Sequence, residues 1–375
     1  MTKKKTVVLG LSGGVDSAVS AHLLLEQGYE VIGVFMRNWD SELNGDFLGN
    51  NGLSKDKCEQ EYDYDDALQV GKELGIKVER MDFVTEYWDD VFKRSLKMWE
   101  KGMTPNPDVF CNKYVKYGYF IDKVMEKYNP DFISMGHYAK IIKKGDTSYL
   151  ALSEDKHKDQ TYFLSGIKKE VLDKVLFPLQ DIEKPQVREI AKKLNLSVMN
   201  KKDSTGICFI GERDFEKFLQ NYLDVSKGNF VDIETNEVVG QHNGVSFYTI
   251  GQRKGLNLGG QKGRYFVVGK DMDKNIIYVS IGTDNKYLYH SGVEATDFNY
   301  LVDKDFLSKV DKENLLVKYR HGETISQASV KFDKENLVVT FKEMQRSLTP
   351  GQEVVLYTND KDNICIGGGI ITKYF

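Results

Sequence analysis

The sequence predicts an α/β fold, in which a doubly wound, mostly parallel sheet is followed by a small central domain and a C-terminal antiparallel β-barrel. Three observations carry this prediction. Apolar runs alternate with helical patterns from residue 6 to about residue 200, and a glycine-rich turn joins the first apolar run to the first helical pattern. Short, evenly spaced strand patterns with turn signals fill the region after residue 278. We therefore expect three domains, at 1–205, 206–278 and 279–375.

Strands and helices are expected to alternate through the first part of the chain. A strand leads into the turn at 10–17, and Gly28 ends the helix that follows. The next expected elements are a strand at 30–36, a helix at 65–74, a strand at 77–82, a long helix at 86–101, a strand at 132–134 and a helix that begins at Lys184 with Pro185 in its first turn. Such sheets bind ligands beyond the carboxyl ends of their strands, where both the turn and Gly136-His137 would lie.

The pattern changes after about residue 204. A small helical pattern at 214–222 precedes a glycine-rich, strand-like region that ends near Tyr278. Short strands are then expected at 315–319, 328–332, 337–341, 353–357 and 364–372. Their even spacing is typical of a small β-barrel.

The composition excludes several classes of protein. The chain has 375 residues, 41% of them apolar, which is enough for two or three domains with a sizeable core. No apolar run approaches the ~18 residues of a membrane span, and the basic start leads into a strand rather than a secretory signal. We therefore expect a cytoplasmic protein with no membrane partner. Four cysteines without a CxxC pair argue against a zinc ribbon or a disulfide scaffold.

Basic residues cluster although the net charge is −4. The stretch 241–270 contains no acidic residue and carries Arg253, Lys254, Lys262, Arg264 and Lys270. A second cluster is formed by Lys192, Lys193, Lys201 and Lys202. Local basic surfaces bind phosphate backbones, so the net charge does not exclude RNA. A solvated face explains these clusters equally well.

The most informative segment of the chain is the turn after the first strand, with its flanks: Val7, Val8, Leu9, Gly10, Leu11, Ser12, Gly13, Gly14, Val15, Asp16 and Ser17. A buried strand here delivers a glycine-rich loop to a helix start, where unpaired N–H groups and the helix dipole favour phosphate. Gly13 and Gly14 permit close backbone approach, and Asp16 can hold a metal that bridges phosphate oxygens. The alternative is an ordinary turn between strand and helix.

Two cysteines stand in unusual surroundings. Asp108 lies three residues before Cys111, so that on a helix the carboxylate could accept the thiol proton. The alternative is a buried cysteine at a helix start with Asp108 as its N-cap. Cys208 lies between Gly206 and Gly211, which indicates either a core cysteine or a mobile loop that carries a thiol to a site. Near the middle of the chain, Lys158 and Gln160 could contact phosphates and a base edge, or cap a helix.

The string from Ser12 to Ser17 resembles the PP-loop of ATP pyrophosphatases, which cleave ATP between the α- and β-phosphates. Further segments at 106–112, 136–139, 158–164, 202–213, 251–256 and 349–352 make nearly the whole chain similar to one family, the bacterial tRNA-specific 2-thiouridylases. Met135 and Thr161 depart from the family pattern without affecting the chemistry. The polar insertion at 41–61 matches no motif.

This resemblance implies a tRNA-uridine 2-sulfurtransferase with an adenine nucleotide α-hydrolase-like first domain. The family exchanges the C2 oxygen of the wobble uridine for sulfur in tRNAs for lysine, glutamate and glutamine. ATP with Mg²⁺ adenylates that oxygen, and sulfur from a protein persulfide replaces it, which releases AMP and pyrophosphate. The target base must first leave its stack. The implied partners are tRNA and a persulfide donor, either a cysteine desulfurase or a sulfur relay protein, and we expect a monomer.

The resemblance also implies roles for individual residues. Gly10, Leu11, Ser12, Gly13, Gly14, Val15, Asp16 and Ser17 would hold the phosphates, with Asp16 as a ligand of Mg²⁺, and Met36 and Gly136 would contact the adenosine. Cys208 would carry the persulfide and Cys111, with Asp108 as its base, would resolve the intermediate through a transient Cys111–Cys208 disulfide. The tRNA contacts would be Asn106, Pro107, Asp108, His137, Lys158, Asp159, Gln160, Tyr319, Arg320 and Gln352. The stretch 241–270 would face the tRNA.

Three other functions remain open from the residues alone. An amidotransferase or synthetase with a PP-loop would not need Cys111 or Cys208. A thiolase of another tRNA position typically shows CxxC cluster ligands, which this chain lacks. A non-catalytic RNA-binding protein would not need Asp16 together with both cysteines, and ATP turnover that depends on tRNA would exclude it.

Overall fold

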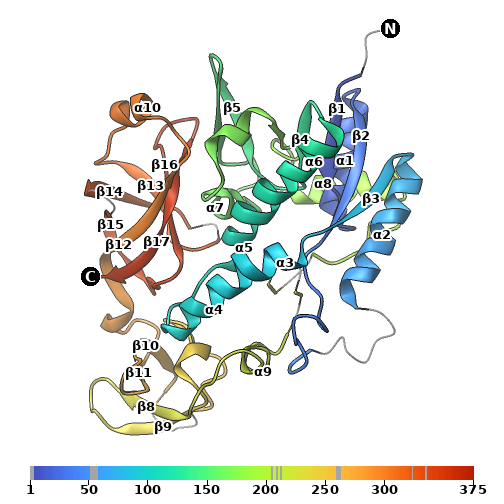
Figure 1. Ribbon diagram of the computed structural model, residues 1–375. Coiled ribbons are helices and arrows are strands. Elements are labelled where there is room, and N and C mark those ends of the chain that lie inside the picture. The colour runs from blue at the N-terminus through green and yellow to red at the C-terminus, as the bar shows by residue number, and fades with distance from the viewer. Residues whose placement is uncertain are drawn as a thin grey trace.

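The computed structural model describes residues 4–50, 58–203, 206–207, 210–211, 213–258, 263–322, 324–333 and 336–375. Within these residues the chain forms a parallel five-stranded sheet with helices, a small four-stranded sheet, a two-stranded hairpin and a closed six-stranded barrel. In Figure 1 the parallel sheet lies at the right, the barrel at the left and the small sheet below the barrel, with α4 crossing between them. The expected fold class is confirmed.

The parallel sheet has the strand order β3-β2-β1-β4-β7, with every neighbouring pair parallel. The elements of this first part are β1 Thr6–Gly10, α1 Val15–Glu26, β2 Glu30–Arg37, α2 Glu59–Leu74, β3 Lys77–Asp82, α3 Val84–Tyr87, the π-helical turn Trp88–Phe92 (η1), α4 Lys93–Glu100, α5 Pro107–Phe110, the π-helical segment Cys111–Tyr119 (η2), α6 Phe120–Tyr128, β4 Phe132–Ser134, β5 Lys140–Lys144, β6 Thr147–Ala151, α7 Thr161–Leu164, the 3₁₀ turn Lys169–Asp173 (η3), β7 Val175–Leu176 and α8 Lys184–Lys193. Strand order reverses beside β1, and this switch point positions the site.

The central strands are apolar throughout because both of their faces are buried. Val7 and Leu9 of β1 join one core, which α1, α2 and α8 cover with buried side chains such as Val187. Val8 points to the opposite face and joins a second core that contains aromatic residues of the helical layer, including Phe92. The alternation along β1 thus gives the sheet one helical layer on each side.

Two helices differ from their expected bounds. The helix expected at 65–74 begins earlier, at Glu59, where the acidic residues Glu59 and Glu61 in the first turn are favoured by the helix dipole. The long helix expected at 86–101 is one helical run in three pieces, α3, η1 and α4, with a π-helical turn in the middle. In that turn Trp88 and Phe92 pack against each other and against Tyr222 of the neighbouring part of the chain.

The small sheet has the order β10-β11-β8-β9, with β8 and β11 parallel and the other pairs antiparallel. Its elements and those that precede it are α9 Phe215–Gln220, β8 Gly228–Asp232, β9 Val238–His242, the 3₁₀ turn Val245–Phe247 (η4), β10 Tyr265–Asp271 and β11 Ile276–Ile281. The turn η4 contacts the first part through Ser246, which donates a hydrogen bond to the carbonyl of Trp99 at 2.8 Å.

The barrel closes in the order β12-β15-β14-β13-β16-β17, with β12 paired to β17. Its elements are the 3₁₀ turn Lys286–Leu288 (η5), β12 Tyr289–Tyr300, α10 Lys304–Lys309, β13 Leu315–Lys318, β14 Ser326–Asp333, β15 Asn336–Arg346, β16 Glu353–Tyr357 and β17 Cys365–Tyr374. The sequence pattern missed β12, because register shifts after His290 and after Thr296 interrupt the alternation of side chains along this strand. It also missed the hairpin β5–β6.

Candidate active site

The turn between β1 and α1 has the backbone that a phosphate site needs. Gly13 has a φ of +72°, and a Cβ at this position would lie 2.2 Å from the carbonyl oxygen of Asp63 on α2. Gly14 is the N-cap of α1, and among the described residues no side chain caps this helix start. The first N–H groups of α1 are therefore available to an anion.

A cavity of about 370 Å³ opens above this turn. Residues from the turn, from β2, from α5, from the segment after β4 and from the Lys158 segment line it. Among them are Gly10, Ser12, Gly14, Val15, Asp16, Ser17, Met36, Asp108, Gly136, His137, Lys158 and Gln160. Gly136 brings β4 against α1, since a Cβ there would lie 2.9 Å from the backbone nitrogen of Ser17. The turn and Gly136-His137, both expected at the carboxyl ends of the strands, thus line one cavity.

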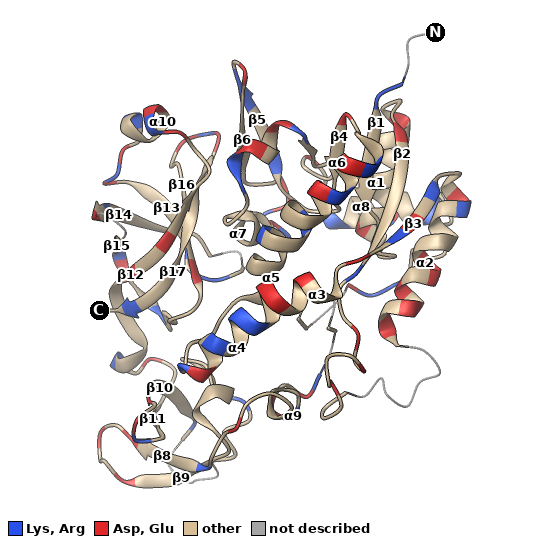
Figure 2. Ribbon diagram, viewed as in Figure 1, with Lys and Arg blue, Asp and Glu red and all other residues tan. Residues whose placement is uncertain are grey.

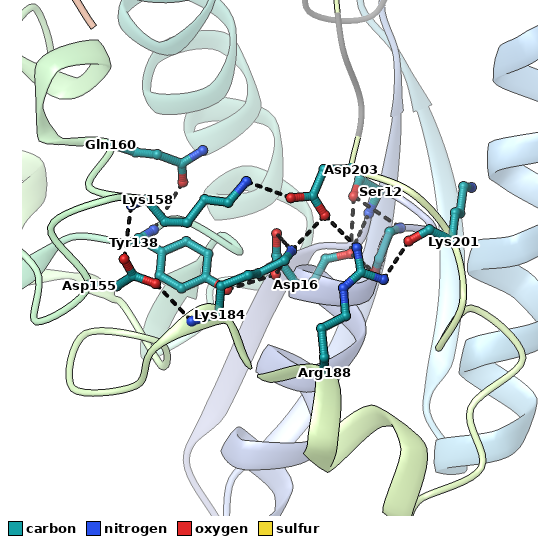
Figure 3. A network of polar contacts seen from close by, with 12 residues as sticks. Ser12, Asp16, Tyr138, Asp155, Lys158, Gln160, Lys184, Arg188, Lys201 and Asp203 are labelled. Atoms are coloured by element: carbon teal, nitrogen blue, oxygen red, sulfur yellow. Dashed lines mark hydrogen bonds and ion pairs between the residues drawn. The ribbon is translucent and has the colours of Figure 1, made fainter. Parts of the chain in front are cut away.

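Asp16 stands at the centre of the polar network in Figure 3. The ammonium group of Lys184, from the start of α8, donates to both carboxylate oxygens of Asp16 at 2.7 and 2.8 Å. The hydroxyl of Tyr138 donates to Oδ1 at 2.9 Å. Burial and the neighbouring Asp16 carboxylate raise the pKa of Tyr138, so this hydroxyl keeps its proton.

Asp203 is a second carboxylate of this network, and three cations converge on it (Figure 3). Lys158 donates to Oδ2 at 2.5 Å, Arg188 donates to Oδ1 at 2.6 Å, and Lys184 lies 2.9 Å from Oδ1. Partial burial acts to raise the pKa of Asp203, but the hydrogen bonds from Lys158 and Lys184 outweigh it and hold that pKa well below its ordinary value. Asp203 is therefore ionised at neutral pH.

Lys201 ties the turn to α2. Its ammonium group donates to the carbonyl of Gly13 at 3.0 Å and to the carboxylates of Asp63 and Asp66 at 2.7 and 2.6 Å. Burial acts to lower the pKa of Lys201, but these two carboxylates raise it above its ordinary value. The lysine therefore stays charged and fixes the outer edge of the turn.

His137 is a buried histidine with a satisfied ring nitrogen. Its Nδ1 lies 2.8 Å from the hydroxyl of Tyr117, and the two rings stack with centroids 5.8 Å apart. Burial, together with the positive charge of Lys116, lowers the pKa of His137 well below its ordinary value. The imidazole is therefore neutral at pH 7, and it reaches the cavity as a lining residue.

The segment with Cys111 forms another wall of the cavity. Asn106 is the N-cap of α5 and accepts from the backbone N–H of Asp108 at 3.2 Å, with Pro107 in the first turn. The N-cap is thus Asn106 and not Asp108. Asp108 and Asn112 line the cavity, whereas Cys111 is completely buried at the junction of α5 and η2.

Cys208 lies outside the described residues. Gly206, Ile207 and Gly211, on either side of it, line the cavity, and Ile207 pairs with Gly211 in an isolated antiparallel bridge. The Cys111–Cys208 disulfide stays a prediction. Cys58 is exposed at the N-cap of α2, and Cys365 is buried in β17, where burial raises the pKa of its thiol.

Asp159 lies in the interior between the first part and the barrel. Its side chain forms an ion pair of 2.8 Å with Lys318 of β13, and both side chains are 1% exposed. Thr161 donates to the same carboxylate at 2.6 Å and exchanges a hydrogen bond with Tyr357 of β16 at 2.9 Å. The tRNA contact predicted for Asp159 stays a prediction, and it would have to come through groups other than this carboxylate.

The barrel residues of the predicted tRNA surface lie near the same junction. Tyr319 is buried in the barrel core, and the exposed Arg320 stacks over its ring at 5.3 Å. Gln352 donates to the carbonyl of Thr104 at 2.8 Å. The next residue after Arg320, His321, stacks on Phe163 with centroids 4.4 Å apart, and Phe163 lines the cavity.

Charge on the rest of the surface is mixed. Figure 2 shows basic residues interspersed with acidic ones over all three parts of the chain, with α2 mainly acidic. In the acid-free stretch 241–270, Arg253, Lys254 and Arg264 are exposed. Lys270 points inward and donates to the carbonyl of Gly102 at 2.9 Å, and burial lowers the pKa of this lysine to about 8. Lys262 lies outside the described residues.

Sequence reasoning missed several residues of the network. The sequence pattern gives Tyr138, Lys184 and Arg188 no role in the site, although Tyr138 follows Gly136-His137 and Lys184 opens an expected helix. It marks Lys201 only by its charge and Asp203 only as a neighbour of Cys208 along the chain. The distances between these residues along the chain hide the network, because it forms only when β1, β4 and α8 are placed side by side.

The described residues contain no cluster of three or more His, Cys, Asp or Glu side chains that could hold a metal ion. In the part of the chain that the structure describes, every helix is too short or too polar to cross a membrane.

Three family models match the chain in order. The tRNA methyl transferase HUP domain matches residues 5–212, the tRNA methyl transferase PRC-barrel domain matches 216–281, and the aminomethyltransferase beta-barrel domain matches 290–371. Because the first match alone spans more than half of the chain, the family assignment rests on most of the sequence.

Curated relatives match over nearly the full length. The tRNA-specific 2-thiouridylase MnmA of Mesoplasma florum is 50% identical over 372 residues, which are 98% of this chain and 99% of that protein. The protein of the same name from Mycoplasma mycoides subsp. mycoides SC is 49% identical over 374 residues, 99% of each chain. Among solved structures, NMN synthetase from Francisella tularensis is 19% identical and covers 57% of this chain and 71% of that chain, with a TM-score of 0.33. A structural likeness this low supports no inference.

Proposed function

Since the chain belongs to the family of tRNA-specific 2-thiouridylases, we propose that it catalyses the ATP-dependent 2-thiolation of the wobble uridine in tRNAs for lysine, glutamate and glutamine. The single observation that carries this proposal is the cavity that the β1–α1 turn shares with the Cys111 segment. A nucleotide bound at the turn would present its α-phosphate to a base held beside Asp108 and Asn112.

The chemistry explains why a phosphate site and a thiol are needed together. A carbonyl oxygen is a poor leaving group, so the uridine C2 oxygen first attacks the α-phosphorus of ATP, and the bond from that phosphorus to the β-phosphate oxygen breaks with release of pyrophosphate. Sulfur then adds at C2, and AMP leaves with the former C2 oxygen. The N–H groups at the start of α1 and the hydroxyls of Ser12 and Ser17 would bind the phosphates.

The two thiols would supply the sulfur and the electrons. The terminal sulfur of a persulfide on Cys208 is transferred to C2, and reduction of that sulfur is balanced by oxidation of the Cys111 and Cys208 thiols to a disulfide. An external thiol reductant then restores both. Asp108, which lines the cavity at the start of the Cys111 helix, would accept the Cys111 proton.

The oxygen-bearing side chains at the turn would suit a bound Mg²⁺ only in part. Mg²⁺ is usually held by one or two carboxylates together with substrate phosphates and water, and Asp16 is a cavity-lining carboxylate beside Ser12 and Ser17. Its oxygens already accept hydrogen bonds from Lys184 and Tyr138, so the ion would be held mainly by phosphate oxygens. When bound, the ion would neutralise phosphate charge as pyrophosphate departs.

The tRNA would lie across the junction of the first part with the barrel. Exposed Arg320, the nearby Gln352 and the Lys158 segment support this path, as do the exposed Arg253, Lys254 and Arg264 of the central part. The persulfide would come from a cysteine desulfurase or a sulfur relay protein. We further propose that the enzyme acts as a monomer in the cytoplasm, with the domain divisions expected from the sequence.

The experiment that tests this function follows the fate of ATP and of the tRNA together. The full chain is incubated with α-labelled ATP, Mg²⁺, a persulfide donor and unmodified glutamate tRNA, and the nucleosides are analysed by mass spectrometry. We expect AMP and pyrophosphate whose release depends on tRNA, and a uridine in which sulfur replaces oxygen. Release of ADP would contradict the proposal. So would formation of a methylated base when S-adenosylmethionine is supplied, since two of the family-model descriptions contain the words tRNA methyl transferase.

One variant separates adenylation from sulfur loading. Asp16→Ala removes the carboxylate that positions Lys184 and Tyr138 at the phosphate turn, so we expect AMP release to be lost while persulfide loading persists. Asp181→Ala, which removes the partner of the surface residue Lys140 at 2.6 Å, serves as the matched control and should behave like the parent. Normal AMP release by Asp16→Ala would contradict the assignment of the turn.

A further inference from the structure

Lys158, Lys184 and Arg188 lie around one carboxylate at the edge of the nucleotide cavity. They come from two separate segments, the loop before α7 and the helix α8, and their charged groups lie 2.5, 2.9 and 2.6 Å from the oxygens of Asp203. Asp16 and Asp155 are the other carboxylates of the network, so the three cations are matched by three anions. An anion that replaced the Asp203 carboxylate would meet all three cations without changing this balance.

The cluster borders the phosphate turn directly. Lys158, Asp16 and Asp203 line the same cavity as Gly14 and Ser17, and Lys184 bridges Asp16 to Asp203. A polyphosphate chain that starts at the N–H groups of α1 and extends along this wall would meet Lys158 and, at the position of the Asp203 carboxylate, Lys184 and Arg188. Charge-assisted hydrogen bonds from lysine and arginine are the usual means of binding phosphate oxygens.

Arg188 and Lys184 each have hydrogen-bond partners other than Asp203. Arg188 also donates to the carbonyls of Met199 and Lys201 at 3.2 and 2.5 Å. Lys184 is anchored by Asp16, and its backbone N–H donates to Asp155 at 2.8 Å. The side chains of Asp203 and Lys158 are more exposed, at 34% and 42%, against 12% for Lys184 and 26% for Arg188. The carboxylate is thus the exchangeable member, and the two α8 cations are fixed.

We propose that Lys158, Lys184 and Arg188 form the binding subsite for the pyrophosphate released from ATP, and that the Asp203 carboxylate occupies this subsite until the polyphosphate displaces it. This inference rests on the proposed cleavage of ATP between the α- and β-phosphates. It assigns Lys184 and Arg188 a direct role in the reaction: they neutralise the charge that develops on the leaving group as the bond to the α-phosphorus breaks. Asp203 would be a competitor of the leaving group rather than a ligand for it.

The test measures binding of inorganic pyrophosphate to the full chain by calorimetry, without tRNA or sulfur donor. Asp203→Asn removes the competing charge at constant size, so we expect pyrophosphate to bind about tenfold more tightly. Lys184→Met and Lys158→Met each remove a charge-assisted hydrogen bond, so we expect binding weakened by about tenfold or more. Lys184→Arg should restore much of the loss. Lys140→Met, which breaks the surface pair with Asp181, should bind like the parent.

The outcomes are decisive because the proposal predicts tighter pyrophosphate binding for Asp203→Asn and weaker binding for the two lysine variants. If Asp203 serves to organise the cations, Asp203→Asn will bind pyrophosphate equally or less well, which overturns the proposal. Unchanged binding by Lys158→Met and Lys184→Met overturns it as well, even where Asp203→Asn does not fold. Because the measurement needs neither tRNA nor sulfur, a failure of the thiolation assay with these pyrophosphate affinities intact would refute the proposed function alone.

Discussion

At the scale of single residues, burial changes the chemistry of Glu353. This glutamate opens β16, is 5% exposed, and lines a second cavity of about 790 Å³ between α4, η2 and the barrel. Burial raises the pKa of Glu353 from 4.5 to about 7, against the opposing effect of the Lys113 charge. The folded chain therefore binds a proton here over a range of pH in which the unfolded chain has lost it.

The sign of the pH dependence follows from this shift. A carboxyl whose pKa is raised by folding stabilises the protein fully below about pH 4.5, and this contribution falls as the pH rises to about 7. Glu353→Gln removes the cost of ionisation, so we expect it to raise the free energy of unfolding by on the order of 2 kcal/mol more at pH 8 than at pH 5. Thermal unfolding at both pH values measures this, with the exposed Glu313→Gln as the control. An equal effect at both pH values would contradict the account.

At the scale of elements, the barrel contacts the segment that contains Lys158 and Gln160. The buried pair Asp159–Lys318 joins β13 to this segment. Gln160 in turn accepts from the N–H of Tyr138 at 3.0 Å, and the Tyr138 hydroxyl reaches Asp16. A continuous set of contacts therefore leads from the barrel to the phosphate turn, and we infer that the barrel helps to position the nucleotide cavity.

The buried Asp159–Lys318 ion pair makes a measurable contribution to the free energy of unfolding. Lys318→Met leaves the Asp159 carboxylate buried without its counter-charge, so we expect a loss of about 3 kcal/mol or more. Asp159→Asn combined with Lys318→Met should cost less than Lys318→Met alone, because no buried charge is left unpaired. Urea unfolding measures both. Lys309→Met, which breaks the exposed pair with Asp305 at 2.6 Å, is the control, and equal losses in Lys309→Met and Lys318→Met would refute this role.

The elements also show what the sequence could predict. Strands β1, β3, β4 and β16 have the bounds expected or nearly so, because apolar runs ended by turn residues mark buried strands. The turn between β1 and α1 was expected from the same local signal, and its phosphate binding stays a prediction. β12 was missed because its register shifts break the pattern, and the Asp203 network was missed because Lys158, Lys184 and Asp203 meet only through the strand order of the sheet.

At the scale of the whole molecule, the first part of the chain forms the cavity, and the barrel packs behind one of its walls. The parallel sheet supplies the phosphate turn, α5 and η2 supply the wall with Asp108 and Asn112, and the barrel stands behind the Lys158 segment. Figure 1 shows α5 lying between the sheet and the barrel. The arrangement suits the proposed substrate, because a wobble uridine in the cavity would lie between the turn at 10–17 and the segment that contains Cys111.

The measurement that tests this account most directly is thiolation of unmodified glutamate tRNA by the full chain with ATP, Mg²⁺ and a persulfide donor, read as retardation on a mercury-containing gel. We predict a retarded band with the parent, lost in Cys111→Ser and in Cys208→Ser, while both variants still bind ATP and tRNA. A retarded band that persists in both variants would contradict the roles of the two thiols. No retarded band with the parent, while ATP is still cleaved to AMP, would contradict the proposed reaction and require another acceptor for the adenylate.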